Sequence, residues 1–223
     1  MMLKRFKSAC SRSVIGALAD DTSGVALTEF AFTAPIFLTL GLVGSDTVSY
    51  VIAHMRISQV ALHVADNASR IGEQDVLVER RIFERDINDL LTGAERYAKG
   101  LDLNANGRII LSSLEMNDDE GQWIHWQRCK GQKDHDSQYG VEDDGIEGTD
   151  FPGMGEPGAE ITASGPDEAV MFVEVAYNYQ PLGPLSTLEG KEITYTASFN
   201  VRDNRNLAGI FPDDPPGVTA SCD

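Results

Sequence analysis

Hydrophobic and polar positions follow three successive patterns along the chain. Residues 25–44 form a nearly uncharged apolar run, about the length that an α-helix needs to cross the hydrocarbon core of a bilayer. Residues 45–71 keep the helical period but have one apolar and one polar face. Beyond residue 100 the pattern changes to strict alternation, which is typical of strands. The sequence therefore predicts an α+β protein, in which a membrane-spanning helix continues into a soluble domain with a second helix and an antiparallel sheet.

The first predicted helix covers residues 25–71. Pro35 is tolerable in a membrane helix, and no glycine or proline interrupts Ser45–Ile71 before the stop signal at Gly72. A buried helix of a soluble protein is the alternative, which the length and the lack of charge disfavour. The apolar face of the second half consists of Ile57, Val60, Ala61, Val64, Ala68 and Ile71.

A second helix is predicted from about Asp75 to Lys99, closed by Gly100. Four alternating segments follow, each with one face expected to be wet, and the last two are joined by a loop at residues 180–190. The predicted strands are 108–116, 122–128, 171–179 and 193–201.

Residues 134–168 differ from the rest of the exported part, residues 72–223. Asp, Glu and Gly dominate this segment, and large apolar residues are few. Because such a composition buries little apolar surface, we expect a mobile acidic insertion. The carboxylates have no fixed spacing, which favours a solvated face over a cation site.

The charge is distributed unevenly. The chain carries a formal net charge of −17, but residues 1–24 hold four basic and two acidic side chains. A basic leader before an apolar span predicts a cytoplasmic N-terminus and an acidic domain on the other side of the membrane. An acidic domain argues against binding nucleic acid. A conventional signal peptide ending at Ala17-Leu18-Ala19 is disfavoured, because the apolar run Val14–Ala19 is short.

Glu29 is the most informative residue of the apolar run. A carboxylate in hydrocarbon is costly, so it needs a partner or a function. It follows Gly24 by five residues and precedes Phe30, which is the layout of a prepilin processing site after a basic leader. The alternative is that Glu29 merely complements the positive end of a membrane helix.

Three cysteines divide between the two sides of the predicted span. Cys10 lies in the leader, whereas Cys129 and Cys222 fall in the exported part, where the surroundings are oxidising. Only one intramolecular pair is available there, and a Cys129–Cys222 disulfide is our prediction. Intermolecular pairing and free thiols remain as alternatives.

Other site chemistry is weakly represented. Asp102, Asn104 and Asn106 match the first half of a calcium loop, but Ser113 occupies the position that requires a bidentate glutamate. Asn and Gly at this point are more simply explained as turn formers. No nucleophile elbow, phosphate-binding loop or metalloprotease motif is present, so we expect neither an enzyme nor a cofactor.

The segment Gly24-Val25-Ala26-Leu27-Thr28-Glu29-Phe30-Ala31-Phe32-Thr33-Ala34-Pro35 resembles the start of the TadE/TadF-like minor pilins, or pseudopilins, of tight-adherence (Flp-type) pilus systems. Two weaker similarities are Trp126–Gly131 and Val173–Leu182. The strong match covers only a small part of the chain.

The resemblance implies a pilin-like component of pilus biogenesis and surface adherence. A membrane prepilin peptidase would cut after Gly24, so that Val25 becomes the N-terminus, and Glu29 would pair with the N-terminal amine of a neighbouring subunit. Phe30 would belong to the same recognition segment. The implied partners are the inner membrane, the peptidase, and other pilin or pseudopilin subunits with the pilus assembly proteins. The implied location is the bacterial inner membrane, crossed once, with the C-terminal domain in the periplasm and incorporation into a surface pilus as a later step. One alternative is an uncleaved TadG-like protein, since these share the start of the motif. The rival from another class is a permanently anchored periplasmic binding module, with calcium as its candidate ligand.

Overall fold

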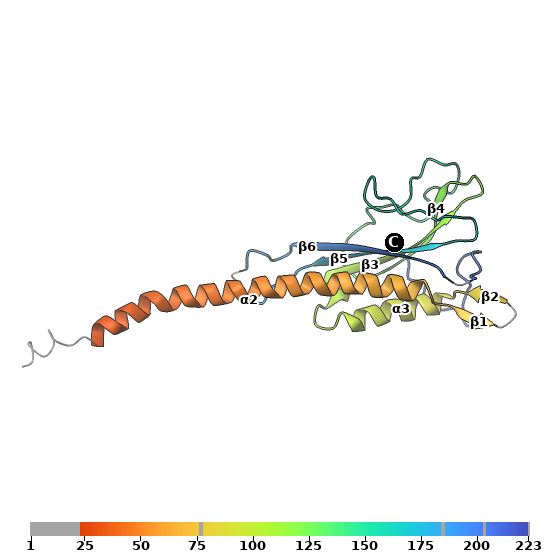
Figure 1. Cartoon of the computed structure of the whole chain (residues 1–223). Helices are drawn as coiled ribbons and strands as arrows, with labels where there is room; N and C mark the ends of the chain where they lie inside the picture. The colour runs from red at the N-terminus through yellow and green to blue at the C-terminus, as the bar shows by residue number, and fades with distance from the viewer. Residues whose placement is uncertain (1–22, 76–77, 184–185, 203, 223) are drawn as a thin grey trace, which may run out of the picture. The chain divides into compact units, whose positions relative to one another are not determined.

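The computed structural model describes residues 23–75, 78–183, 186–202 and 204–222 (Figure 1). The chain divides into two compact units, Met1–Asp46 and Thr47–Asp223. All but the last two residues of the predicted leader, and Cys10 with them, lie outside the described part. The described residues of the first unit are helical throughout and belong to α2 (Ser23–Ala68), whose later turns are part of the second unit.

The second unit is an α+β domain, as the sequence predicts. Its four long strands match the predicted ones to within one or two residues at each end, because strict alternation is a strong signal. The elements after α2 are β1 (Glu73–Asp75), β2 (Val78–Arg81), α3 (Glu84–Tyr97), α4 (Leu103–Asn106), β3 (Gly107–Met116), β4 (Gln122–Lys130), β5 (Val170–Asn178) and β6 (Glu192–Asn200).

The main sheet is fully antiparallel, with strand order β4-β3-β5-β6. Its register places Ile110 of β3 between Cys129 of β4 and Glu174 of β5. One irregularity interrupts the β3–β4 ladder between Ser113 and Leu114. These pairings fix which residues of neighbouring strands share a face of the sheet.

One face of the sheet packs on helices. In Figure 1, α3 and the part of α2 beyond residue 47 lie on the same side of the sheet. Helix α3 contributes Ile87, Leu91 and Ala94, all buried as its predicted apolar stripe requires. The predicted face of α2 is buried too, except that Ile71 lies beyond the end of the helix and is only partly buried. The sheet side of this core comprises Ile109, Leu111, Trp126, Met171, Val173, Val175, Tyr177, Ile193 and Ala197.

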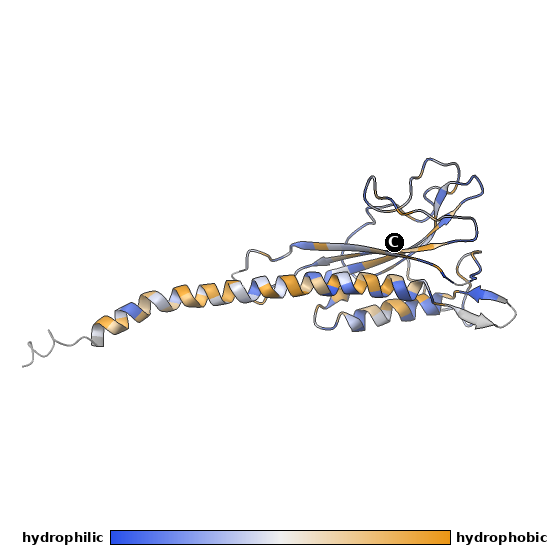
Figure 2. Ribbon diagram, viewed as in Figure 1, coloured by the Kyte–Doolittle hydropathy of each residue, from blue (hydrophilic) through white to orange (hydrophobic). Residues whose placement is uncertain are grey.

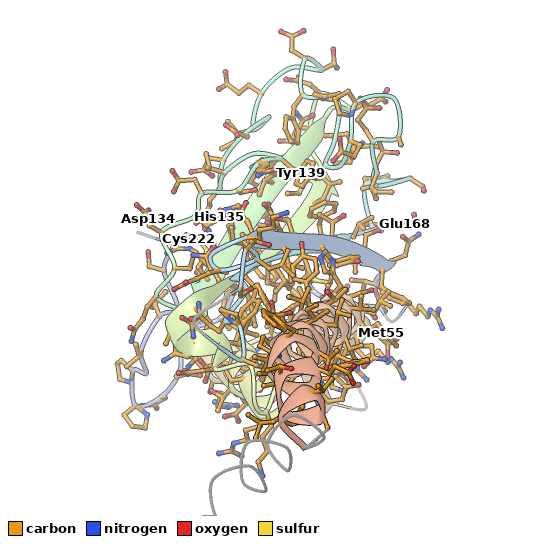
Figure 3. All side chains as sticks on the ribbon, turned by 90° about the vertical axis from the view of Figure 1, so that its left-hand side faces the viewer. Met55, Asp134, His135, Tyr139, Glu168 and Cys222 are labelled. Carbon is orange, nitrogen blue, oxygen red and sulfur yellow. A yellow bond between two sulfur atoms is a disulfide. The ribbon has the colours of Figure 1, made fainter. Side chains whose placement is uncertain are left out.

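The opposite face of the sheet is also covered, which corrects two predictions. Strand β5 is buried on both faces, so the expectation of one wet face per strand is wrong for it. The cover is the acidic segment 134–168. In Figure 3, where Tyr139 is labelled, this segment lies on the side of the sheet away from the helices. A second hydrophobic cluster forms there from Leu114, Ile124, Met154, Ala163, Val170 and Phe172, with Tyr139, Phe151 and Ile161 packed against it. The expectation that this segment buries little apolar surface is therefore wrong.

The second helix begins nine residues later than predicted. Strands β1 and β2 pair with each other where the helix was expected to begin, and Arg80 pairs with the C-terminal segment through Asn204 and Asn206. This long-range pairing overrides the local helical pattern. Helix α3 begins after Phe83, whose backbone N–H donates to the Asp86 carboxylate at 3.0 Å and so satisfies one free donor of the first turn.

Candidate functional site

The sequence-predicted processing segment, Gly24–Phe30, lies in the first two turns of α2. Gly24 has ordinary helical surroundings, and a Cβ built on it would meet no atom within 4 Å among the described residues. A glycine inside a helix is destabilising by roughly 0.5–1 kcal/mol relative to alanine. The described part of the helix therefore gives no packing reason for a glycine at this position.

Glu29 projects from the exposed surface of the same turns, and neighbouring Phe30 is 71% exposed. The backbone carbonyl of Glu29 accepts a hydrogen bond from the Thr33 hydroxyl at 2.9 Å. Its carboxylate has no hydrogen bond or ion pair with any residue that the structure describes. The arrangement thus presents a glycine, a carboxylate and an aromatic ring together at the start of an apolar helix.

The helix that carries this segment is long and apolar enough to cross a membrane. Apolar residues, orange in Figure 2, dominate its first turns, and large side chains such as Phe32, Phe37 and Leu38 are exposed. Hydroxyl groups in this stretch donate to carbonyls three or four residues earlier, as Thr39 does to the carbonyl of Pro35 at 2.9 Å. Polar side chains satisfied within the helix suit a hydrocarbon environment.

The predicted Cys129–Cys222 disulfide is confirmed. It joins the C-terminal segment to β4 across a sequence separation of 93, with a Cα–Cα distance of 4.8 Å. The backbone N–H of Cys129 donates to the carbonyl of Ala220 at 2.8 Å, and Arg108 donates to the carbonyl of Cys222. The C-terminal segment therefore lies along the outer edge of β4, which it shields from pairing with another chain.

The candidate calcium loop has another local structure. Asp102 precedes the short helix α4 in a left-handed conformation (φ 47°), and the amide of Asn106 donates back to the carbonyl of Asp102 at 3.3 Å. The carbonyl of Asn104 accepts the backbone N–H of Gln132 at 2.7 Å. Within the described residues, no three His, Cys, Asp or Glu side chains come together as metal ligands. The three residues act as turn formers between α3 and β3, the simpler of the two interpretations.

A buried carboxylate that sequence reasoning missed lies at the centre of β5. Glu174 is 1% exposed and bonds to His135 Nε2 at 2.8 Å. It also accepts hydrogen bonds from the Ser137 hydroxyl and the backbone N–H of Gln138, both at 3.2 Å. Its signal in the sequence is a single charge within the otherwise uncharged strand Val170–Asn178. Such a residue requires partners from elsewhere in the chain, and here they come from the acidic segment.

A second carboxylate extends this network at the start of β6. The hydrogen bond from Lys133, more than the charge of Lys133, holds the pKa of Glu192 below its usual value. His135 Nδ1 also lies 3.7 Å from the Glu192 carboxylate. The network fastens the beginning of the acidic segment to both β5 and β6.

A cavity of about 530 Å³ opens beside the disulfide. Its lining includes both Arg108 and Arg128, together with His135 and Glu142. Arg128 is already engaged, because it forms a two-pronged ion pair with Glu84 at 2.7 Å and a further contact with Glu142 at 3.0 Å. The cavity is polar and of mixed charge, which suits a small polar molecule.

Comparisons with known proteins assign no relative to the chain. No protein family, curated protein or solved structure matches it. A function for the chain is accordingly proposed from its own residues.

Proposed function

We propose that the chain is a TadE/TadF-like minor pilin, made as a precursor and inserted once in the inner membrane. Two general features of the structure support the proposal: an apolar N-terminal helix of membrane-spanning length and a disulfide-bonded α+β domain. The disulfide fits an oxidising compartment, which agrees with export of the domain. A basic leader before the helix agrees with a cytoplasmic N-terminus.

Gly24 is the observation that carries the proposal. Packing among the described residues does not require it, yet it stands five residues before a carboxylate in the motif that a prepilin peptidase would recognise. A protease that must bring its catalytic groups close to the scissile bond selects a residue without a side chain, whereas a packed helix does not. We infer that Gly24 serves cleavage, with Val25 as the mature N-terminus.

Mass spectrometry of the protein extracted from membranes tests this inference. In cells with an active prepilin peptidase, we expect a mature chain that begins at Val25, and full-length precursor when Gly24→Leu is introduced. Gly41→Leu is the matched control, because Gly41 is also a helical glycine whose Cβ would meet nothing within 4 Å among the described residues. A wild-type chain that keeps its first residues while other prepilins are cut in the same cells would contradict the proposal and favour an uncut, TadG-like protein.

Glu29 would act in assembly. A carboxylate in hydrocarbon is stabilised chiefly by a charged partner, and the N-terminal amine that cleavage creates on a neighbouring subunit supplies one. We expect Glu29→Gln to be cut normally but to fail to enter pili, measured as subunit in the sheared filament fraction. Thr28→Gln, one position earlier on the same exposed turn, controls for the new amide side chain. Normal incorporation of Glu29→Gln would exclude the pairing.

The rival function is a permanently anchored binding module. The 530 Å³ cavity beside the disulfide is the feature that favours it. In that case Glu29→Gln and Gly24→Leu would both leave the protein's function unchanged, whereas in the pilin interpretation both abolish assembly. Calcium has no support as its ligand, since the described residues gather no suitable group of side chains.

A further inference from the structure

The part of α2 that belongs to the second unit has two apolar faces at its start. One face, which includes Ala53 and Ile57, is buried in the domain core. The other is exposed and carries Val48, Val51, Ile52 and Met55, spaced at i, i+3, i+4 and i+7. Met55 is 58% exposed, and Figure 3 labels it at the surface of the molecule. We call these four residues the outer stripe.

The outer stripe ends abruptly. The exposed residues that follow, Arg56 and Gln59, are polar, although they continue the same side of the helix. Leu62 is exposed one turn later but stands alone, beside the stacked rings of His63 and Tyr97. A helix that packs along a partner helix would be apolar over its whole contact length. The exposed face of α2 is apolar up to Met55 and polar after it. This change fits a helix that passes from an apolar into an aqueous medium.

The loop between β5 and β6 lies at the same end of the domain. Its base is fixed to α2, because the rings of Tyr179 and Tyr50 meet edge to face with centroids 5.0 Å apart. The loop closes on itself where the backbone N–H of Gly190 donates to the carbonyl of Tyr179 at 3.1 Å. Leu182, three residues from Tyr179 and therefore within about 10 Å of it along the chain, is 71% exposed.

The composition of this loop is exceptional for so acidic a chain. Residues 180–188 contain no Asp, Glu, Lys or Arg, whereas residues 134–168 contain eleven carboxylates and no Lys or Arg. The acidic segment packs on the face of the sheet opposite the helices, around Phe172. An uncharged loop can approach the phosphates of a headgroup layer without repulsion, whereas a dense acidic segment is repelled wherever the lipids are anionic.

The length of the helix brings the outer stripe to the membrane surface. From Val25 to Met55 the helix extends about 46 Å at roughly 1.5 Å per residue, against about 40–45 Å for a bilayer with both headgroup layers. Asp46 is the only carboxylate between Phe30 and Met55, and it is only 8% exposed. If the first turns lie at the cytoplasmic surface, the outer stripe therefore lies at the level of the outer headgroups.

We propose that the outer stripe and Leu182, in the described first part of the β5–β6 loop, form a second membrane contact, in which the exported domain rests on the headgroup layer of the outer leaflet. Val48, Val51, Ile52, Met55 and Leu182 enter the boundary between headgroups and acyl chains, and Tyr50 lies at the level where tyrosines concentrate in membrane proteins. The contact rests on the proposed single membrane span. It would hold the domain against the membrane before assembly, a role that neither cleavage nor the Glu29 pairing supplies.

Fluorescence quenching by spin-labelled lipid tests the contact on the full-length protein. The protein carries Cys10→Ser, and the disulfide protects its other two native cysteines, so that a single introduced cysteine takes the fluorophore. It is reconstituted in phosphatidylcholine vesicles whose lipids bear a nitroxide at a shallow acyl-chain position. The probe sites are Leu182→Cys and Met55→Cys. Val218→Cys is the matched control, an 80% exposed apolar residue of the C-terminal segment. Leu40→Cys reports the span itself in a second set of vesicles whose nitroxide lies near the end of the acyl chain, because Leu40 lies about 22 Å from Val25 along the helix, near the middle of a bilayer.

We expect quenching at Leu182 and Met55 to exceed that at Val218 by about threefold or more, because insertion by 5–10 Å brings the probe among the nitroxides. Quenching at Leu40 without quenching at Leu182 and Met55 overturns the contact and leaves the span intact. No quenching at Leu40 overturns the span and the contact with it. Disulfide-linked dimers through Met55→Cys, formed without lipid quenching, would show that a second copy covers the stripe and would likewise overturn the proposal.

Discussion

Loss of the Cys129–Cys222 disulfide should destabilise the α+β domain strongly. The bond closes a loop with a sequence separation of 93. In the chain-entropy model, a loop of this length removes about 4–5 kcal/mol of conformational freedom from the unfolded chain at 25 °C. A domain of this kind has a total stability of about 5–15 kcal/mol, so on this figure roughly a quarter or more of it depends on this bond. The chain-entropy figure is an upper value, because disulfides typically contribute about 2–4 kcal/mol.

The domain contains its own probe for this experiment. The two tryptophans of the chain, Trp123 and Trp126, both lie in β4, the strand that also carries Cys129. Urea unfolding of the full-length protein in mild detergent can therefore be followed by tryptophan fluorescence, without interference from the membrane helix. With a slope of about 2 kcal/mol/M, a loss of 4 kcal/mol lowers the midpoint by about 2 M.

The variants are Cys129→Ser with Cys222→Ser, compared with Cys10→Ser as a cysteine substitution that leaves the bond intact. We expect the double variant to unfold about 1–2 M earlier in urea than wild type, and Cys10→Ser to unfold with it. A midpoint within about 0.3 M of wild type, with the bond verified in wild type by mass spectrometry, would refute the reasoning. It would mean that the hydrogen bonds of the C-terminal segment hold it in place without the disulfide.

Two further predictions concern the acidic segment. Glu174→Ala leaves the donors of His135 and Ser137 without their buried acceptor, so we expect a loss of about 2–4 kcal/mol in the free energy of unfolding and faster hydrogen exchange in residues 134–140; unchanged exchange would contradict the network. Burial, and then the hydrogen bond to Glu156, raise the pKa of Tyr139 to about 12 from 10.0. The folded state then retains a proton that the unfolded state has lost, so stability should fall between pH of about 10 and 12. This fall should be smaller in Tyr139→Phe when melting temperature is measured against pH, and an equal fall in both proteins would sink the assignment.

The strands could be predicted from the sequence because each is defined by its own alternation. Strand β6, with Ile193 and Ala197 buried between more exposed neighbours, has the half-wet pattern that was expected. Strand β5 has a similar alternation of larger side chains, but the intervening residues Phe172 and Ala176 are buried as well. Alternation alone does not tell whether a second layer covers the other face, since that layer comes from a distant segment.

The structural errors share one cause, namely pairing between residues far apart in the chain. Strand β2 is held at Arg80 by Asn204 and Asn206, more than a hundred residues away. The acidic segment was judged by its composition, yet it is fastened at Glu174 and around Met154, a residue that is almost completely buried. Neither contact can be predicted from local pattern or composition, because both depend on residues that are distant in the sequence and close in the fold.

The candidate site is described in another way, by comparing residues of the same type that stand in different surroundings. Glycines such as Gly107 and Gly131 are required by the fold, because a side chain there would clash with a backbone oxygen. Gly24 shows no such constraint among the described residues. The same contrast separates Glu174, whose carboxylate is bonded to several groups within the domain, from Glu29, whose carboxylate has no partner among the described residues. Gly41 and Gly44 of the same helix also meet no atom within 4 Å among the described residues, so the spacing to Glu29 distinguishes Gly24 and its lack of packing does not. A glycine and a carboxylate five residues apart at the start of an apolar helix are the basis on which we propose a peptidase and a neighbouring subunit as partners.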